Sequence, residues 1–268
     1  MDCGKAKLRQ RREQIVDALE SYRPHPELLL FDFLWLDPKF VHAVNEGSFA
    51  EVVQEAAPDV FVVHVFSDEF CDLLIEEVQA FEASGLPRVR PNAQNWSGAI
   101  LNEIGMGDFF SQFISRCLEP LAKALFGRQF SQGLDPADHH AFVVSYGEGK
   151  DTSLDLHMDD SDLTFNMCLG AACSGGELVF HGTAGDEDED IPTLTTRFEG
   201  RGHAILHLGS RKHRVGQLIS GWRLNLVLWC LDKNSILAGN SCKYYDDLTE
   251  ELSRRTQTNI SDLGQQNT

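Results

Sequence analysis

"LHMDDSDLTFNMCLG", residues 156–170, sets a histidine and three aspartates directly ahead of a segment in which polar and apolar side chains alternate. Thr164, Asn166 and Cys168 alternate there with larger apolar residues. Alternation of this kind is typical of a strand with one face in a core. A strand that begins beside so many metal-binding side chains predicts a functional site at its entrance.

The segments around this stretch also have the composition of strands. Short β-branched and aromatic runs alternate with glycine-rich turns, and no helical pattern lies between them. These runs are AFVVSY (141–146), ELVFHG (177–182), GHAILHLG (202–209) and WRLNLVLWCL (222–231). Several short strands in succession predict a β-sandwich or jelly-roll barrel over residues 136–232.

The first half of the chain has mainly helical patterns. "VFVVHVF" at 60–66 predicts a strand, and the capping-type start at Ser67 predicts a helix that continues through 76–85 to Gly85. Residues 109–127 predict an amphipathic helix in which Pro120 fits poorly. We expect an α+β, mainly β chain. Its parts are a helical segment at 1–57, a strand-helix support region at 58–135, the β core at 136–232 and a polar, partly disordered tail at 233–268.

Composition excludes several classes of function. The net charge of −18, from 23 basic against 41 acidic residues, repels phosphate backbones and anionic membranes, so we expect no nucleic-acid partner and no membrane insertion. The most apolar run, 28–36, is too short to span a bilayer. The seven cysteines include no CxxC pair, and no signal-peptide pattern precedes them, which argues against a secreted disulfide framework. We expect a soluble, intracellular protein, cytoplasmic or nuclear.

The histidine and the first aspartate of the opening stretch form the candidate metal site. His157 and Asp159 are two residues apart, so in an extended segment both side chains leave the same side of the backbone. We expect Asp160 and Asp162 to be exposed turn residues. A third ligand must come from a later strand. The later strands offer three histidines, His203, His207 and His213.

An arginine inside a buried strand supplies a second clue. Arg223 lies ten residues after His213 in an otherwise apolar run, and a buried guanidinium is costly without an anionic partner. Two histidines and one carboxylate on one face of iron leave three positions open, as in non-haem Fe(II) oxygenases. 2-Oxoglutarate fills two of these positions and O2 the third. The distal carboxylate of 2-oxoglutarate matches the planar guanidinium of Arg223.

The order His157-x-Asp159, His213, Arg223 resembles the 2-oxoglutarate and Fe(II)-dependent oxygenase superfamily, in its prolyl and lysyl hydroxylase branch. The resemblance covers about residues 58–232, and residues 61–105 are similar to one group of that branch. It implies a double-stranded β-helix, a jelly-roll form, flanked by helices, and in some members the use of ascorbate to keep the iron reduced.

The resemblance also assigns residues around the co-substrate. Tyr146 matches a tyrosine that contacts 2-oxoglutarate in relatives, and Thr164 and Asn166 are expected to line the same pocket. Cys168 stands where relatives often carry a tyrosine that helps hold the distal carboxylate. This departure puts the second anchor of that carboxylate in doubt, though not Arg223.

The implied reaction is hydroxylation of a C–H bond, with 2-oxoglutarate converted to succinate and CO2. His157, Asp159 and His213 would hold the iron. Halogenating relatives carry a small residue in place of the aspartate, so Asp159 favours hydroxylation. Kinship suggests a protein or peptide side chain such as Pro or Lys as substrate, by analogy of fold. A small-molecule substrate stays open.

Simpler interpretations stay open for each of these residues. A His-x-Asp pair is common at surfaces, and His207 is the rival of His213 as third ligand. Arg223 could form an internal ion pair, and Tyr146 could be a packed strand tyrosine. The acidic run "GDEDED" at 185–190 could favour a cationic peptide at the pocket mouth or be a solvated insertion.

Two other classes of function also stay open. One is a catalytically idle jelly-roll module that binds a partner. The other is a metal-dependent hydrolase or cupin-like metal binder, for which zinc would be the preferred ion. Arg223 disfavours this last class, because a hydrolytic zinc site needs an activated water and a general base but no buried arginine.

Overall fold

The computed structural model describes residues 22, 24–85, 90–183 and 192–235. Its helical elements are η1 (Pro26–Leu28), η2 (Phe33–Trp35), α2 (Pro38–Glu46), α3 (Asp68–Ala83), α4 (Gly107–Phe113), the π turn η3 (Ile114–Leu118), α5 (Glu119–Phe126) and η4 (Gly127–Phe130). Its strands are β1 (Val53–Ala57), β2 (Val60–His64), β3 (Gly98–Ile100), β4 (Leu134–Tyr146), β5 (Leu154–His157), β6 (Leu163–Gly175), β7 (Leu178–Thr183), β8 (Pro192–Thr196), β9 (His203–Leu208), β10 (Arg211–Val215) and β11 (Leu218–Asp232). The acidic run 185–190, residues 1–21 and residues 236–268 lie outside the described residues.

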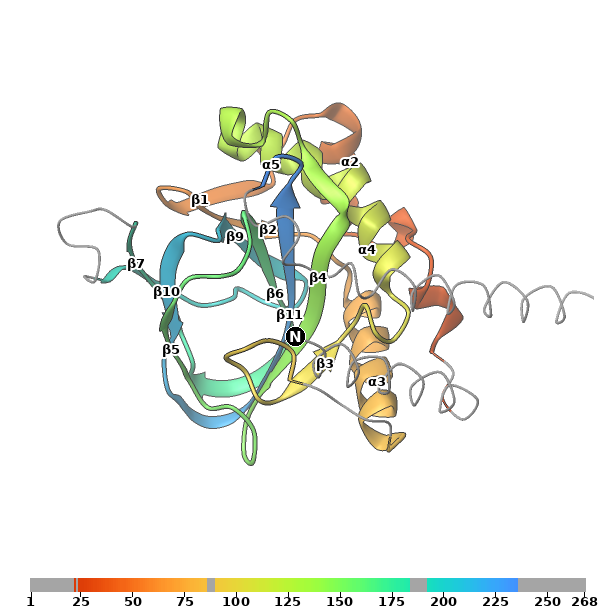
Figure 1. Cartoon of the computed structure of the whole chain (residues 1–268), viewed down its shortest axis with the longest axis vertical. Coiled ribbons are helices and arrows are strands. Elements are labelled where there is room, and N and C mark those ends of the chain that lie inside the picture. The colour runs from red at the N-terminus through yellow and green to blue at the C-terminus, as the bar shows by residue number, and fades with distance from the viewer. Residues whose placement is uncertain (1–21, 23, 86–89, 184–191, 236–268) are drawn as a thin grey trace, which may run out of the picture.

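Two antiparallel sheets form the core, as the strand pattern predicted. The large sheet has the order β1-β2-β9-β6-β11-β4-β3 and the small sheet the order β5-β10-β7-β8. The two sheets curve around a common interior, with the small sheet on the left in Figure 1. Phe142, Val144 and Val227 from the large sheet pack there with Phe180 and Val215 from the small sheet. The prediction of a jelly-roll fold is confirmed.

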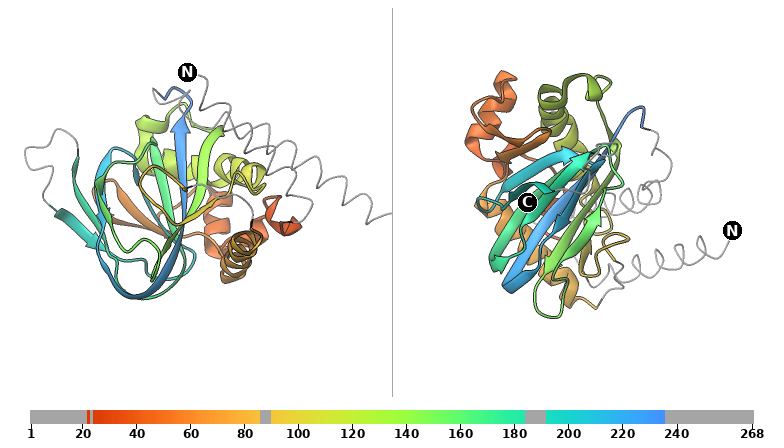
Figure 2. Two further views of the ribbon diagram at one scale, coloured as in Figure 1. Left: turned by 60° about the horizontal axis from the view of Figure 1, so that its bottom comes forward. Right: turned by 90° about the vertical axis from the view of Figure 1, so that its left-hand side faces the viewer.

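The other face of the large sheet is covered by helices. Leu74 of α3 and Phe113 of α4 belong to one buried cluster with Phe165 of β6, and the Phe113 and Phe165 rings lie 5.6 Å apart. Figure 2 shows α3 and α4 running along this side of the sheet. The alternating side chains of residues 163–169 therefore point into two different interiors, one on each face of the large sheet. The apolar residues of this segment face the helices, and Asn166 faces the space between the sheets.

The predicted start and stop of the helix near residue 76 are confirmed. Ser67 caps α3 by accepting a hydrogen bond from the backbone N–H of Phe70 at 3.2 Å. The chain leaves the helix at Gly85, whose φ of +74° is a conformation that glycine adopts easily. The support region 58–135 also supplies β2 and β3 to the large sheet, and β1 of the N-terminal segment pairs with β2.

The prediction of a helix over 109–127 in which Pro120 fits poorly is confirmed, and the structure shows how the chain accommodates the proline. The segment consists of α4, the π turn η3 and α5, and Pro120 stands in the first turn of α5. Proline lacks the backbone N–H and collides with the carbonyl four residues earlier in an α-helix. A wider π turn directly before Pro120 avoids both problems, and the first turn of the next helix tolerates proline.

Two expectations from composition can be compared with this structure. Within the described ranges, no helix is long and apolar enough to cross a membrane. The five cysteines there are free, and four of them are buried, as expected of small core residues: Cys71, Cys117, Cys168 and Cys230, with Cys173 partly exposed.

Candidate active site

The turn between β5 and β6 carries the opening stretch from the small sheet to the large one. The backbone N–H of Asp159 donates to the carbonyl of Gly209 at 2.9 Å, which ties the turn to the short connection between β9 and β10. The carboxylate of Asp162 accepts from the N–H of Asp232 at 2.8 Å. Asp160 is exposed as expected, whereas Asp162 is half-buried and fastens the turn to the end of β11.

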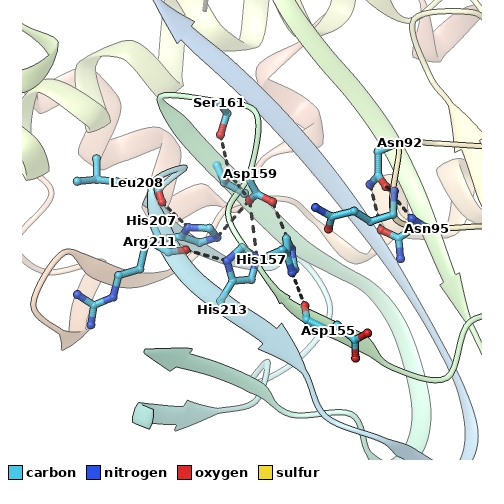
Figure 3. Close-up of polar contacts among 12 residues, drawn as sticks. Asn92, Asn95, Asp155, His157, Asp159, Ser161, His207, Leu208, Arg211 and His213 are labelled. Carbon is cyan, nitrogen blue, oxygen red and sulfur yellow. Dashed lines mark hydrogen bonds and ion pairs between the residues drawn. The ribbon is translucent and has the colours of Figure 1, made fainter. Parts of the chain in front are cut away.

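Three of the predicted site residues converge at this turn. His157 ends β5 and lies directly opposite His213 of β10. Nε2 of His157 is 3.5 Å from one carboxylate oxygen of Asp159, and Nε2 of His213 is 3.8 Å from the other. One ligand atom from each residue lies within 4.8 Å of those from the other two. Figure 3 shows the two rings and the carboxylate pointing toward one another, the geometry needed to hold one metal ion.

Backbone carbonyls fix how the two imidazoles are presented. Nδ1 of His157 lies 2.7 Å from the carbonyl of Asp155, and Nδ1 of His213 lies 3.0 Å from that of Arg211. A carbonyl only accepts, so Nδ1 carries the hydrogen in both rings. Each Nε2 is left with a lone pair directed at the carboxylate, the tautomer that a metal-binding histidine needs.

The carboxylate of Asp159 is held by a chain of hydroxyls. Thr164 donates to Oδ2 of Asp159 at 2.6 Å, and its own oxygen lies 2.8 Å from the hydroxyl of Ser161. Since the hydrogen of Thr164 is used on Asp159, Ser161 donates to Thr164. This chain holds Oδ2, the oxygen of the carboxylate that also faces His213 and His207.

The protonation states also suit a metal ion. Burial alone would raise the pKa of Asp159, but attraction between the carboxylate and the protonated forms of its histidine neighbours, His213 first, outweighs burial and holds that pKa below its usual value. Burial lowers the pKa of His213 to about 3, against the opposing attraction of Asp159. A charged carboxylate beside the neutral imidazole of His213 suits a divalent metal ion.

The rival third ligand, His207, lies beside this group without belonging to it. Its Nε2 is 3.8 Å from Oδ2 of Asp159, and its ring centroid is 4.6 Å from that of His213. Among the described residues, the group whose ligand atoms are mutually close consists of His157, Asp159 and His213. The other histidine of β9, His203, stacks on His64 at 4.4 Å, outside the pocket.

Arg223 lies at the opposite end of the same pocket. It is buried, with 5% of its surface exposed, and one of its terminal nitrogens donates to the carbonyl of Gly176. Its guanidinium carbon is 4.7 Å from the ring centroid of Tyr146, its direct neighbour across β4 and β11. Among the described residues, Nε of Arg223 has no hydrogen-bond partner, and no carboxylate forms an ion pair with the guanidinium. The alternative of an internal ion pair is therefore not found in that part of the chain.

One pocket connects the His157, Asp159 and His213 group with Arg223. It is lined by the two histidines and the aspartate, by Arg223 and Tyr146, and by apolar side chains of both sheets. The hydroxyl of Tyr146 accepts a hydrogen bond from Asn95 at 3.4 Å. Asn225 donates to Asn166 at 2.7 Å across the pocket floor, and its own amide oxygen has no partner among the described residues.

The remaining predicted residues lie at the edges of this pocket. Thr164 is directed at Asp159 and is absent from the pocket lining, which suits a role in holding the carboxylate better than contact with a co-substrate. Cys168 lines a neighbouring hollow that shares Arg223. Sequence analysis missed Asn225, although it stands two residues after Arg223 in one strand and so faces the same side.

These residues fit a bound metal ion and a dicarboxylate. The histidines and the aspartate offer two neutral nitrogens and one charged oxygen, a set that suits Fe(II). The unpartnered Nε of Arg223 and amide oxygen of Asn225 are buried polar atoms that need a ligand's groups. A dicarboxylate with one end on the metal and the other on Arg223 would satisfy the arginine.

Comparison with known proteins agrees with this chemistry. Residues 19–130 match a family model described as the OGFOD2-like domain. The chain is 36% identical over 226 residues to human "2-oxoglutarate and iron-dependent oxygenase domain-containing protein 2", covering 81% of this chain and 61% of that protein. It is 33% identical over 223 residues to the Arabidopsis thaliana "2-oxoglutarate and iron-dependent oxygenase domain-containing protein CP2", covering 78% of this chain and 56% of that protein.

Two more distant matches were found. A mouse "Procollagen-lysine,2-oxoglutarate 5-dioxygenase 2" is 28% identical over 153 residues, 53% of this chain and 20% of that protein. A solved structure of prolyl 4-hydroxylases from Phytophthora capsici superimposes with a TM-score of 0.48 at 14% identity, covering 82% of this chain and 69% of that one.

The chain is similar to the family of 2-oxoglutarate and iron-dependent oxygenases. The similarity is to the group named domain-containing protein 2 and to the plant protein CP2. The chain spans between 56% and 61% of the length of the first relatives that it matches.

Proposed function

We propose that this protein is an Fe(II)- and 2-oxoglutarate-dependent dioxygenase that hydroxylates a C–H bond. The observation that carries the proposal is the single pocket that has the His157, Asp159 and His213 group at one end and the unpaired Arg223 at the other. The iron would supply the oxidising chemistry, in which O2 and 2-oxoglutarate yield succinate, CO2 and the hydroxylated substrate.

The protein's own residues have distinct tasks in this proposal. Asp155 and Arg211 keep the two ligand imidazoles in the tautomer that leaves Nε2 free, through the carbonyls already described. Thr164 holds the carboxylate of Asp159 in place. The apolar lining supplied by both sheets limits water near the reacting atoms, which strengthens the electrostatic contacts inside the pocket.

Arg223 would anchor the distal carboxylate of 2-oxoglutarate. Its guanidinium is fixed by the carbonyl of Gly176 on one side and the ring of Tyr146 on the other. A held guanidinium can receive a carboxylate with little loss of side-chain freedom. Asn225 and Asn166 offer amide groups along the floor between the two ends.

The proposed substrate is a side chain of a protein or peptide, such as proline or lysine. The mouse relative's name refers to procollagen lysine, which supports this class. A hollow of about 430 Å³ also borders His157, between β5 and the segment that carries Trp96. Trp96, 71% exposed, and Leu156, 38% exposed, line this hollow, and exposed apolar side chains of this kind are typical of docking surfaces.

The experiment that tests the proposal measures 2-oxoglutarate binding to the Mn²⁺-loaded protein by titration calorimetry. The wild type should bind 2-oxoglutarate only when metal is present. Arg223→Gln should weaken binding by about 100-fold, because truncating one partner of a buried charge pair costs roughly 2–5 kcal/mol. Arg214→Gln, a change of the same type on β10, should have no effect. Equal affinity of the wild type and Arg223→Gln would remove Arg223 from the site.

A further inference from the structure

His207 is the buried histidine that the proposed mechanism leaves without a task. It lies next to the last residue of β9 with none of its surface exposed, and its ring packs against Phe180 at 5.1 Å and His213 at 4.6 Å between centroids. Its Nε2 points toward Asp159, 3.8 Å from Oδ2 (Figure 3). The side chain therefore borders the metal site directly.

The hydrogen on its ring can be assigned from geometry. Nδ1 of His207 lies 2.8 Å from the carbonyl of Leu208, so Nδ1 carries the hydrogen and donates it there. With the hydrogen on Nδ1, Nε2 of the neutral ring is an acceptor, presented in the same way as Nε2 of His157 and of His213.

This acceptor lacks a donor among the residues that the structure describes. Nε2 of His207 has no hydrogen-bond partner there, and the polar atom nearest to it on Asp159 is a carboxylate oxygen, also an acceptor. Two buried acceptors that face each other repel, and although Oδ2 of Asp159 accepts from Thr164, Nε2 of His207 loses its hydration without replacement. The arrangement is favourable only when a proton donor or a cation occupies the space that they share.

We propose that His207 is a positioning residue of the metal centre, whose Nε2 accepts a hydrogen bond from a water molecule held between it and Asp159 when the metal site is filled. The inference rests on the proposed function, because it presupposes the metal. A direct ligand role is disfavoured because His207 lies outside the group of mutually close ligand atoms. Residues that contact the ligands of a metal without binding it tune its affinity.

The test compares Mn²⁺ affinity and metal-free stability in matched variants. His207→Asn keeps a donor near the position of Nδ1 but removes Nε2, and His207→Gln returns a polar atom near the position of Nε2. We expect Mn²⁺ affinity to fall about 10- to 100-fold in His207→Asn and to recover to within a few-fold of wild type in His207→Gln. His203→Asn, on the same strand but outside the pocket, should leave the affinity unchanged.

Comparison of the two variants separates this role from simple packing. In the presence of a chelator, His207→Asn and His207→Gln should both unfold at a lower temperature than the wild type, because both lose the packing of the buried ring against Phe180. Mn²⁺ affinity should nevertheless differ between them. Equal Mn²⁺ affinity in the two variants, or wild-type affinity in His207→Asn, would make His207 a core histidine and overturn the proposal.

The remaining outcomes are equally distinct. Complete loss of Mn²⁺ binding in His207→Asn, with a Co²⁺ absorption spectrum that changes as it does in His157→Ala, would make His207 a direct ligand and contradict the positioning role. Failure of the wild type to bind Mn²⁺ at all would instead overturn the proposed function.

Discussion

At the scale of the residue, the histidines at the candidate metal centre share one hydrogen-bonding arrangement. His157, His207 and His213 each donate Nδ1–H to a backbone carbonyl within two residues along the chain. Each Nε2 is thereby directed at the same carboxylate, that of Asp159. Because the backbone sets the tautomers, the donors are oriented before a metal arrives, which reduces the loss of freedom on binding.

The hydroxyl of Thr164 should matter for metal affinity. It donates to Oδ2 of Asp159 at 2.6 Å, so Thr164→Val removes the contact while keeping the shape of the side chain. We expect Mn²⁺ affinity to fall about 10-fold, as is usual when a partner of a metal ligand is lost. Titration calorimetry measures this. Thr195→Val on β8 is the control, and equal losses in both variants would argue against the role of Thr164.

At the scale of the element, the site depends on the close approach of two connections, the turn before β6 and the link between β9 and β10. Gly209 lies between β9 and β10, and its carbonyl accepts the N–H of Asp159. A Cβ at this position would lie 1.9 Å from the carbonyl oxygen of Ser161, a backbone atom that cannot move aside. The turn that carries Asp159 and the connection that leads to His213 can meet only because this position has no side chain.

Gly209→Ala should therefore damage both stability and the metal site. We expect the free energy of unfolding to fall by roughly 2–4 kcal/mol, the range of a severe steric conflict, and Mn²⁺ affinity to fall with it. Gly200→Ala is a suitable control, because a Cβ there makes only ordinary contact, 3.4 Å from His203. Denaturant unfolding of the two variants gives the comparison. A Gly209→Ala protein as stable as Gly200→Ala would contradict the close approach.

The elements that the sequence predicts best are those with strong local signals. Alternation in residues 163–169 and the cap at Ser67 determine local conformation, so β6 and α3 lie where expected. The break before Pro120 is harder to foresee, because a single proline does not specify whether a helix kinks, stops or widens into a π turn.

Contacts between distant segments account for what the sequence did not reveal. The spacing of His157 and Asp159 is a local signal, and the Arg223 position follows from a charge in an apolar run. The approach of His207 to Asp159 depends on how β6 and β9 pair, with Thr164 opposite His207. Register between strands is set by the packed fold and cannot be derived from either strand alone.

At the scale of the whole molecule, the large sheet separates two interiors with different tasks. One face packs against α3 and α4 through phenylalanines such as Phe66, Phe113 and Phe165, which gives the fold its stability. The other face and the small sheet enclose the polar pocket. Unpartnered polar groups can be tolerated in the pocket because the apolar interior on the other face stabilises the fold.

A buried histidine far from the metal site should make the stability of the molecule depend on pH. Nδ1 of His139 donates to the carbonyl of Pro136 at 2.9 Å, and Nε2 accepts from Asn102 at 3.1 Å, so the ring is fixed as the neutral form. Burial lowers its pKa from 6.5 to about 4. Between these values the unfolded chain binds more protons than the folded one, so stability is lost as the pH falls.

Between pH 6.5 and pH 4, the free energy of unfolding should fall by about 3 kcal/mol because of His139, at 1.36 kcal/mol for each unit of pKa. Chemical unfolding in the presence of a chelator, followed across this window for the wild type and for His139→Gln, measures it. The variant should show a flatter pH dependence. Identical slopes would mean that His139 is not held neutral in the fold.

The most direct test of the central claim is formation of succinate from 2-oxoglutarate, followed by NMR under air with Fe(II) and ascorbate, with and without a peptide library. The account predicts succinate in the wild type and in His203→Ala, and none in His157→Ala, Asp159→Ala or under nitrogen. Wild-type protein with bound iron that forms no succinate, or a His157→Ala variant as active as the wild type, would contradict the assignment of this pocket as an oxygenase site.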